Sequence, residues 1–442
     1  MVGFKNLAWL QEPNHRRLAA DGKKESSNLG ILAFETAKIM SKLVSLYKSL
    51  SIEGISRLQN DVVRSRGVQF LNSMDEEYLL SLACAEKLED LDRAASAVSC
   101  LGKKCNDFGL NRFDIIYTDL KLGIANFGKL ESHGSRVSEK KMRKMEKLVS
   151  TTSCLQAALE ALTEMEISER RLKQLTNRQI EMMKINLDDF NEKLENQRKE
   201  VRYFRENSLW TQTFDKSVDL MARIVCVVYL KICAVFGPQR MFLQGKIVSH
   251  SGPLLTKSKP IMVRFYSQRS IDFPAEGETA KSNSNGVFHS AGPETVGGSG
   301  LTTRYANLII LAEKYLDSKV SISPDEREAF YQMVPENVKS VLRTKLSRKM
   351  RCAESDASLA EGWRDAMAEM MSWLAPMAHD SVKWQMERKL ERMKFDDADK
   401  ANSVLLLQTL HFSDKEKTEA AIAEVLVGLS CIFRFENRQL CV

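Results

Sequence analysis

The sequence predicts an all-α protein made of helical bundles, with a long heptad-patterned helix and an internal linker rich in Gly, Ser and Pro. First, no proline occurs from residue 14 to 237, and neither Gly nor Pro from 135 to 236. Proline costs a helix interior about 3 kcal/mol and glycine about 1 kcal/mol, so such stretches favour helices. Second, the period-two alternation typical of strands is missing. Third, 43% of the 442 residues are hydrophobic, enough to fill buried cores.

Composition and apolar spacing divide the chain into five parts. We expect a flexible N-terminus, an N-terminal helical domain, a long heptad helix followed by an apolar helix, a flexible linker and a C-terminal helical domain. In this order they cover residues 1–27, 28–130, 131–237, 238–300 and 301–442. The net charge of +7 is a small excess in a chain that is 28% charged, and the intermixed acids and bases are typical of solvated helix faces.

Several short helices are expected in the N-terminal domain. Ser73 and Glu76 have the spacing of a capping box, in which the hydroxyl accepts from the backbone three residues on and the glutamate reaches back. The helix that begins there places Leu79, Leu82 and Leu88 at helical spacing. Gly102 offers a left-handed stop for this helix.

The clearest pattern is a heptad repeat from residue 145 to 204, interrupted by a polar stretch from Glu166 to Thr176. A seven-residue repeat keeps one apolar stripe against a partner helix. One continuous helix is the favoured interpretation; two helices folded at the polar stretch are the alternative. The partner is either the chain's own helices, with residues 211–236 the best candidate, or a second copy. The packing or partner seam consists of Leu148, Leu155, Leu162, Ile180, Met183, Leu187, Phe190, Leu194, Val201 and Phe204.

Composition changes abruptly at the linker and returns to helical patterns after it. Residues 237–300 hold nine Gly, five Pro and nine Ser in 64 positions, which is typical of a loop. After the linker we expect a helix over 302–316 and one on either side of Pro335. A further helix carries Trp363 and Trp373, and the last runs from about Lys415 to Phe433.

Motifs for catalysis, cofactors or metals were not found. The six histidines are scattered without zinc spacing, and the nine cysteines form no C-x-x-C pair, so buried reduced thiols are expected. The glycines of Gly297–Gly300 could form an anion-binding nest, but a flexible lead into a helix is the preferred interpretation. The sequence therefore predicts no catalytic residue, no cofactor and no metal site.

The strongest apolar run, from Met221 to Gly237, is interrupted by Arg223 and Lys231. A membrane-spanning helix needs about 20 nearly uncharged residues, so we interpret this run as a buried core helix. Two basic clusters are candidate nuclear-import signals. The preferred one is in the N-terminal segment, which an import receptor can bind in extended form, and consists of Arg16, Arg17, Lys23 and Lys24. The other is Lys140–Lys144, on a predicted helix.

Several longer motifs carry a resemblance. The stretches are Ser27–Ala37 and Leu91–Ala95 in the first half, and His250–Leu255, Thr295–Leu301, Tyr331–Glu336 and Trp373–His379 in the second. In this order they resemble the two domains of unknown function of the plant PSK SIMULATOR family. The resemblance implies growth-promoting proteins tied to phytosulfokine peptide-hormone signalling, at least some of them nuclear, with no catalytic residues. Some members begin Met-Gly and could be myristoylated; Val2 departs from that signal.

The favoured hypothesis is a non-enzymatic helical adaptor that promotes plant growth, located in the nucleus. It binds protein partners through helical surfaces, can form a homo-oligomer, binds no specific nucleic acid and has no transmembrane segment. The alternative is a coiled-coil scaffold in the cytoplasm or at a membrane surface, not tied to hormone signalling. An enzyme of unrecognised type is the third hypothesis. A deep pocket with converging polar groups would support it.

Overall fold

The structure is a computed structural model. In the residues that it describes, regular secondary structure is helical, and extended backbone pairs only at two isolated bridges, Asn28 with Thr213 and Thr295 with Asp414. The predicted all-α class is confirmed. The described residues are 28–124, 134–176, 184–237, 286–317, 323–350, 357–393 and 403–439.

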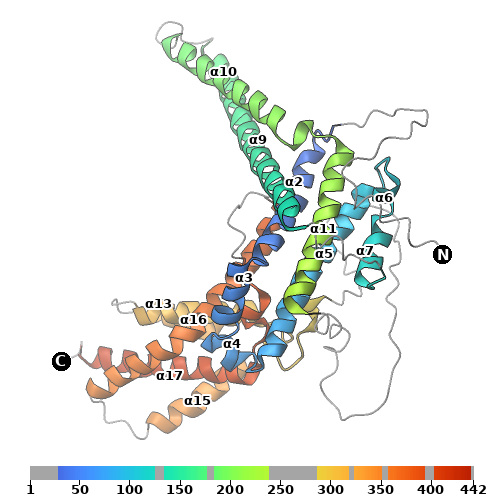
Figure 1. Cartoon of the computed structure of the whole chain (residues 1–442). Helices are drawn as coiled ribbons and strands as arrows, with labels where there is room; N and C mark the ends of the chain where they lie inside the picture. The colour runs from blue at the N-terminus through green and yellow to red at the C-terminus, as the bar shows by residue number, and fades with distance from the viewer. Residues whose placement is uncertain are drawn as a thin grey trace, which may run out of the picture.

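The described N-terminal residues form the helices drawn in blue and cyan in Figure 1. The helices are α2 (Leu32–Ser49), α3 (Ile52–Arg57), α4 (Arg66–Leu71), α5 (Glu76–Gly102), α6 (Phe108–Asn111) and α7 (Phe113–Lys121), with one π-helical turn at Leu58–Val62. The long helices α2 and α5 pack on each other, and α7 lies on α5.

The start of α5 differs from the expected capping box. Asp75 is the N-cap residue, and its carboxylate accepts hydrogen bonds from the backbone N–H groups of Glu77 and Tyr78 at 2.9 and 3.2 Å. The Ser73 hydroxyl instead accepts from the Asp75 N–H, and Glu76 pairs with Arg64. The capping box was wrong because a carboxylate directly before the helix satisfies two of its unpaired donors at once.

An arm of two antiparallel helices projects from the rest of the molecule (Figure 1). It consists of α9 (Gly134–Thr176) and α10 (Lys184–Asn207). The Gln197 side chain donates to the carbonyl of Ala158 at 3.2 Å, although these residues would lie about 60 Å apart in one continuous helix. The predicted continuous helix is therefore wrong, and the alternative of two folded helices is what the structure shows. Leu155 and Ala158 of α9 pack with Val201 of α10, and the polar stretch lies towards the tip.

The apolar helix α11 (Phe214–Phe236) lies against α5 and α2, and its Ile224, Val225 and Cys226 are fully buried. The two charges that interrupt the run are accommodated at its edges. Arg223 Nε lies 2.9 Å from the Asp219 carboxylate, and Lys231 Nζ lies 3.8 Å from the centre of the Tyr47 ring. The prediction of a buried core helix is confirmed. In the described ranges, no helix has the length and hydropathy needed to cross a membrane.

The C-terminal helices begin after a packed segment. Residues 286–300, which were expected to belong to the flexible linker, include a 3-10 turn at Val287–Ser290 and lie against the helices around them, whereas 238–285 fall outside the described residues. Gly300 has φ +71° and leads into the next helix. The helices that follow are α13 (Thr302–Asp317), α14 (Pro324–Met333), α15 (Glu336–Met350), α16 (Ala357–Met393) and α17 (Lys415–Gln439).

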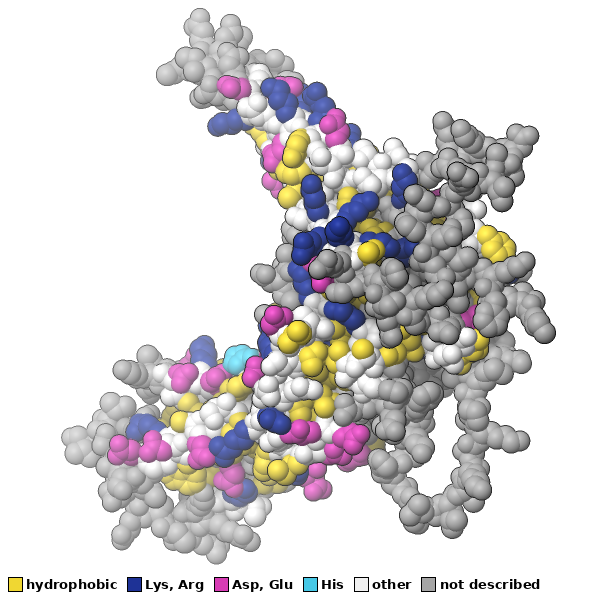
Figure 2. All heavy atoms as spheres, in the orientation of Figure 1, with side chains coloured by type: hydrophobic (Ala, Val, Ile, Leu, Met, Phe, Trp, Pro, Cys, Tyr) yellow, Lys and Arg dark blue, Asp and Glu magenta, His cyan; other side chains and the backbone are white. Residues whose placement is uncertain are grey.

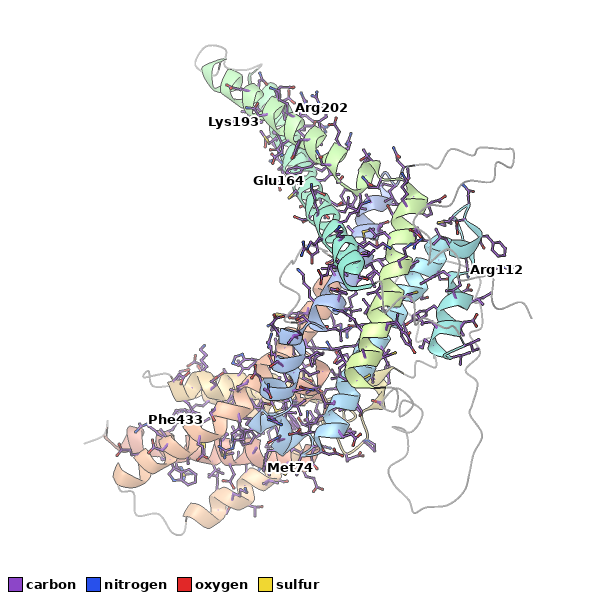
Figure 3. The ribbon with its side chains drawn as sticks, in the orientation of Figure 1. Met74, Arg112, Glu164, Lys193, Arg202 and Phe433 are labelled. Carbon is purple, nitrogen blue, oxygen red and sulfur yellow. The ribbon has the colours of Figure 1, made fainter. Side chains whose placement is uncertain are left out.

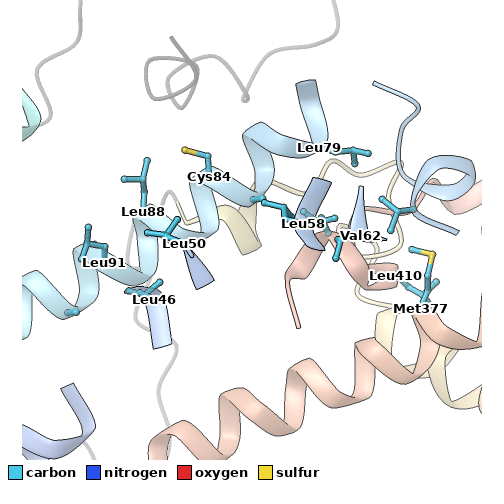
Figure 4. Close-up of a cluster of buried hydrophobic side chains, with 14 of the residues drawn as sticks. Leu46, Leu50, Leu58, Val62, Leu79, Cys84, Leu88, Leu91, Met377 and Leu410 are labelled. Atoms are coloured by element: carbon cyan, nitrogen blue, oxygen red, sulfur yellow. The ribbon is translucent and has the colours of Figure 1, made fainter. Parts of the chain in front are cut away.

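One hydrophobic core connects the two halves of the chain. It contains buried residues of α2, α5 and α11 together with residues of α13, α16 and α17. Figure 4 shows part of it, where Leu58 and Val62 face Met377 and Leu410. A separate small cluster of Leu155, Ala158 and Val201 holds the arm together. The outer part of the arm thus has apolar contacts of its own, while Met142, Met145 and Leu148 of α9 belong to the main core.

Candidate functional site

Helix α4 lies directly against α16, and a glycine makes this approach possible. A Cβ atom built on Gly67 would lie 2.6 Å from the carbonyl oxygen of Trp373 and 2.7 Å from the sulfur of Met377. Beside it the rings of Phe70 and Trp373 meet edge to face, 5.2 Å between centroids. Real Cβ atoms do not approach a backbone oxygen this closely, so this contact between the two halves requires glycine at position 67.

We call the region where α4 and α5 contact α16 the junction. A cluster of buried charges lies farther along it. Glu86 of α5 is 5% exposed and accepts hydrogen bonds from the backbone N–H of Leu406 at 2.7 Å and from Trp384 Nε1 at 3.2 Å. Arg388 of α16 donates to Glu86 at 3.4 Å and to Asp90 at 3.1 Å. Lys42 of α2 lies 2.9 Å from the Asp90 carboxylate. These charged groups therefore connect the N-terminal helices α2 and α5 with the C-terminal helix α16.

The environment moves the pKa values of these groups in different directions. Burial raises the pKa of Glu86, and the nearby Asp90 adds to the rise. Burial opposes ionisation of Asp90 as well, but Lys42 and Arg388 outweigh it and hold its pKa below the usual value. Burial lowers the pKa of Lys87, whose Nζ donates to the Ser49 hydroxyl at 2.9 Å. The opposite charges of this cluster therefore compensate one another.

A cavity of about 30 Å³ lies between these groups, with room for about two water molecules. Its lining also includes Ser45, Glu387 and Leu405. A drug-sized ligand needs a pocket of several hundred Å³, so this space is far too small for a substrate of ordinary size. The charged groups contact one another across it, and their arrangement holds helices together.

Two buried cysteine thiols lie in environments that disfavour the reactive thiolate. Burial raises the pKa of both Cys105 and Cys226 to about 12, so these thiols stay protonated at neutral pH. In the part of the chain that is described, no three His, Cys, Asp or Glu side chains lie close enough to hold a metal ion.

The segment 286–300 is attached to the junction by polar and aromatic contacts. The backbone N–H of Val287 donates to Glu89 of α5 at 2.8 Å. The Phe288 ring stacks on Trp384 and on His411, with centroids 5.6 and 4.3 Å apart. His411 Nε2 lies 2.8 Å from the Phe288 carbonyl oxygen, and burial lowers the pKa of this histidine. An uncharged imidazole therefore forms part of the packing.

The glycine-rich loop Gly297–Gly300 does not form an anion-binding nest. Its first glycine donates its N–H to the His411 carbonyl at 2.8 Å, and Gly298 donates to the Thr295 hydroxyl at 3.0 Å. Gly300 donates to Gly297 at 3.0 Å. A nest needs backbone N–H groups that point at a ligand, and here they are bonded within the protein. The loop attaches this segment to the chain just before α17.

The predicted seam divides between the two arm helices and the main core. Leu148 lies in the main core, Leu155 and Val201 lie in the arm cluster, and Leu162 and Phe204 pack against it. Leu194 is 2% exposed and Phe190 is half-buried. Ile180, Met183 and the side chain of Leu187 lie outside the described residues. The same holds for the candidate import residues Arg16, Arg17, Lys23 and Lys24.

The second basic cluster, Lys140–Lys144, lies within α9. Met142 and Met145 on its inner face are 3% and 0% exposed, so this stretch is fixed in the main core as a helix. Sequence reasoning missed the junction residues Gly67, Glu86 and Arg388. None of the three stands out in the sequence, because each acquires its role only when α4 or α5 is placed against α16.

Two segments of the chain match family descriptions. Residues 31–87, from α2 to the middle of α5, match a domain of unknown function (DUF3475). Residues 295–383, from the glycine-rich loop to the middle of α16, match a protein family of unknown function (DUF668). The Gly67 contact joins one matched segment to the other.

Curated relatives cover nearly the whole chain. PSK SIMULATOR 1 of Arabidopsis thaliana is 26% identical over 414 residues, which are 92% of this chain and 56% of that protein. PSK SIMULATOR 2 of the same plant is 24% identical over 438 residues, 97% of this chain and 63% of that protein. These matches support the PSK SIMULATOR family. It spans little more than half the length of PSK SIMULATOR 1, and no solved structure matches it. In this chain, the junction described above connects both matched segments.

Proposed function

We propose that this protein is a non-enzymatic helical adaptor that promotes plant growth through phytosulfokine-linked signalling. The observation that carries this proposal is the likeness to three proteins named PSK SIMULATOR, which in each case extends over at least 92% of the chain. Both matched domains and the arm between them fall within this likeness. The growth role comes from that kinship.

Features of the structure support an adaptor rather than a catalyst. The buried polar groups at the junction are bonded to one another around a cavity with room for about two water molecules. The arm, by contrast, projects from the body and presents two long helix faces (Figure 1). Figure 3 shows Glu164, Lys193 and Arg202 along it, directed away from the helix pair. Such a shape offers surfaces for other proteins and a rigid body to hold them.

Rescue of growth tests the proposed role. Plants lacking this gene and its close relatives should grow less, and the wild-type chain should restore growth and the response of roots to added phytosulfokine. Gly67→Leu, which separates the two matched domains, should restore little, whereas Gly362→Ala, at an open position on α16, should restore growth fully. Unchanged growth in plants without these genes would reject the growth role and favour a scaffold unrelated to hormone signalling.

We place the protein in the nucleus, with Arg16, Arg17, Lys23 and Lys24 as the import signal. The alternative cluster on α9 is fixed as a helix in the core, whereas an import receptor binds an extended chain. Changing the four N-terminal residues to Ala should move a fluorescent fusion towards the cytoplasm. A wild-type fusion found only at a membrane would contradict the nuclear location itself.

A further inference from the structure

The first turns of α9 carry a stripe of exposed cations. Lys140, Arg143, Lys144 and Lys147 are all exposed and occupy positions i, i+3, i+4 and i+7, which share one face of a helix. The opposite face is held in the main core by Met142 and Met145. We name the four residues the basic face. Because the helix is anchored from behind, the basic face keeps a fixed spacing over about 10 Å.

None of the four cations of the basic face forms an ion pair with a described residue, whereas many other surface cations do. The neighbouring cations are paired with acids: Lys48 of α2 with Glu146, and Arg223 of α11, which lies near Lys141, with Asp219. Burial lowers the pKa of Lys141, and the positive charge of Arg223 lowers it further. Figure 2 shows Lys and Arg side chains gathered where the arm joins the body.

We propose that the basic face binds an acidic segment of a partner protein, with carboxylates spaced to meet the four cations of α9. The proposal rests on the adaptor function and names the chemistry of one partner. An acidic helix places carboxylates at the same i, i+3, i+4 and i+7 positions, so a helix lying alongside α9 can match each cation. Val137, 52% exposed and one turn before Lys140, offers an apolar contact at the end of the stripe.

The same residues fit other anionic partners less well. Single-stranded nucleic acids bind through bases stacked on aromatic side chains, and α9 contains no aromatic residue from Gly134 to Thr176. Helices that lie on membranes insert their apolar face into the lipid. Here that face, including Met142, Met145 and Leu148, is buried in the protein's own core. A protein segment needs neither feature.

Binding of defined peptides to the full chain tests this inference. The probe is a fluorescent alanine-based helical peptide with Glu at i, i+3, i+4 and i+7, compared with the same peptide carrying Gln. The Glu peptide should bind and weaken with added salt, and the Gln peptide should not bind. Lys140→Glu with Lys144→Glu should reduce affinity by about tenfold or more, equivalent to about 1.4 kcal/mol. Lys193→Glu with Lys199→Glu, exposed positions on α10, should leave binding unchanged.

Several results would overturn the inference. They are equal binding of the Glu and Gln peptides, or the same loss of affinity in the α10 control variant. Duplex DNA or a phosphatidylserine vesicle could also bind more tightly than the Glu peptide. If the α9 substitutions abolish that binding, the ligand of the basic face is DNA or lipid and not a protein segment. Both double variants should keep the wild-type melting temperature, because all four positions are exposed. Failure of peptide binding with intact growth rescue would reject this partner and leave the growth function standing.

Discussion

The contact at Gly67 predicts a large effect of adding a single methyl group. In Gly67→Ala the new Cβ would lie 2.6 Å from the Trp373 carbonyl oxygen, and that oxygen belongs to the backbone of α16, so no side-chain rotation relieves the clash. Overpacking of this kind costs about 1–3 kcal/mol. The better helix propensity of alanine offsets up to about 1 kcal/mol. We therefore expect a net loss of about 1–2 kcal/mol in the free energy of unfolding.

Two other glycines provide matched controls for this prediction. Gly362 of α16 has no atom within 4 Å of a built Cβ, so Gly362→Ala should stabilise the protein by about 0.5–1 kcal/mol. The three atoms nearest a Cβ built on Gly428 of α17 all belong to the side chain of Met367, with the sulfur at 2.5 Å, and a flexible methionine can move away. Gly428→Ala should therefore fall between the other two.

Urea unfolding followed by far-UV circular dichroism measures this order. The midpoint should rise for Gly362→Ala, change little for Gly428→Ala and fall for Gly67→Ala. If Gly67→Ala is as stable as Gly362→Ala, the two matched domains do not meet as closely as described, and the account of the junction fails.

The remaining predictions concern the buried charges and the arm. The pKa of Glu86 is raised from 4.5, so its favourable contribution to the free energy of unfolding is present below that pH and is lost as pH rises through the folded-state pKa. Glu86→Gln should therefore gain stability relative to wild type as pH rises. Asp90→Asn should lose stability relative to wild type above pH 3.8, because the pKa of Asp90 is lowered; urea midpoints across pH that show the same slope for both variants would contradict the pairing scheme. Leu155→Asp should open the arm, since an unpaired buried carboxylate costs several kcal/mol, and hydrogen exchange should rise along α9 and α10 while α11 stays protected. Uniform loss of protection across the chain would show that the arm is not a separate unit.

The helices were largely predictable from sequence because their limits are marked locally. Pro335 separates α14 from α15, and Gly237 ends α11 with a φ of +77°. The apolar run of α11 is buried as predicted, since its charges are few and lie at the edges. These features depend on neighbouring residues only, which is why a single sequence reveals them.

The pairing of helices was not predictable in the same way. The heptad phase on both sides of the polar stretch suits one long helix or two antiparallel ones, because a seam does not specify what covers it. At the junction, Glu86 and Arg388 are ordinary charged helix residues until α5 and α16 are placed together. Gly67 carries no local signal at all, since its role is a contact with Trp373, far away in the sequence.

The contacts of the junction also set the order in which the chain can fold. The Asn72 side chain donates to the carbonyl of Leu407, 335 residues later, and accepts from the Ser413 hydroxyl, 341 residues later. During synthesis at about 5–20 residues per second, the N-terminal helices must wait on the order of tens of seconds for these partners. Gly67 and Val68 of α4 are buried in the folded chain, and we expect them to be exposed until these partners emerge. This protein should therefore depend on chaperones during translation more than a helical bundle with local contacts, which can complete its core as it emerges.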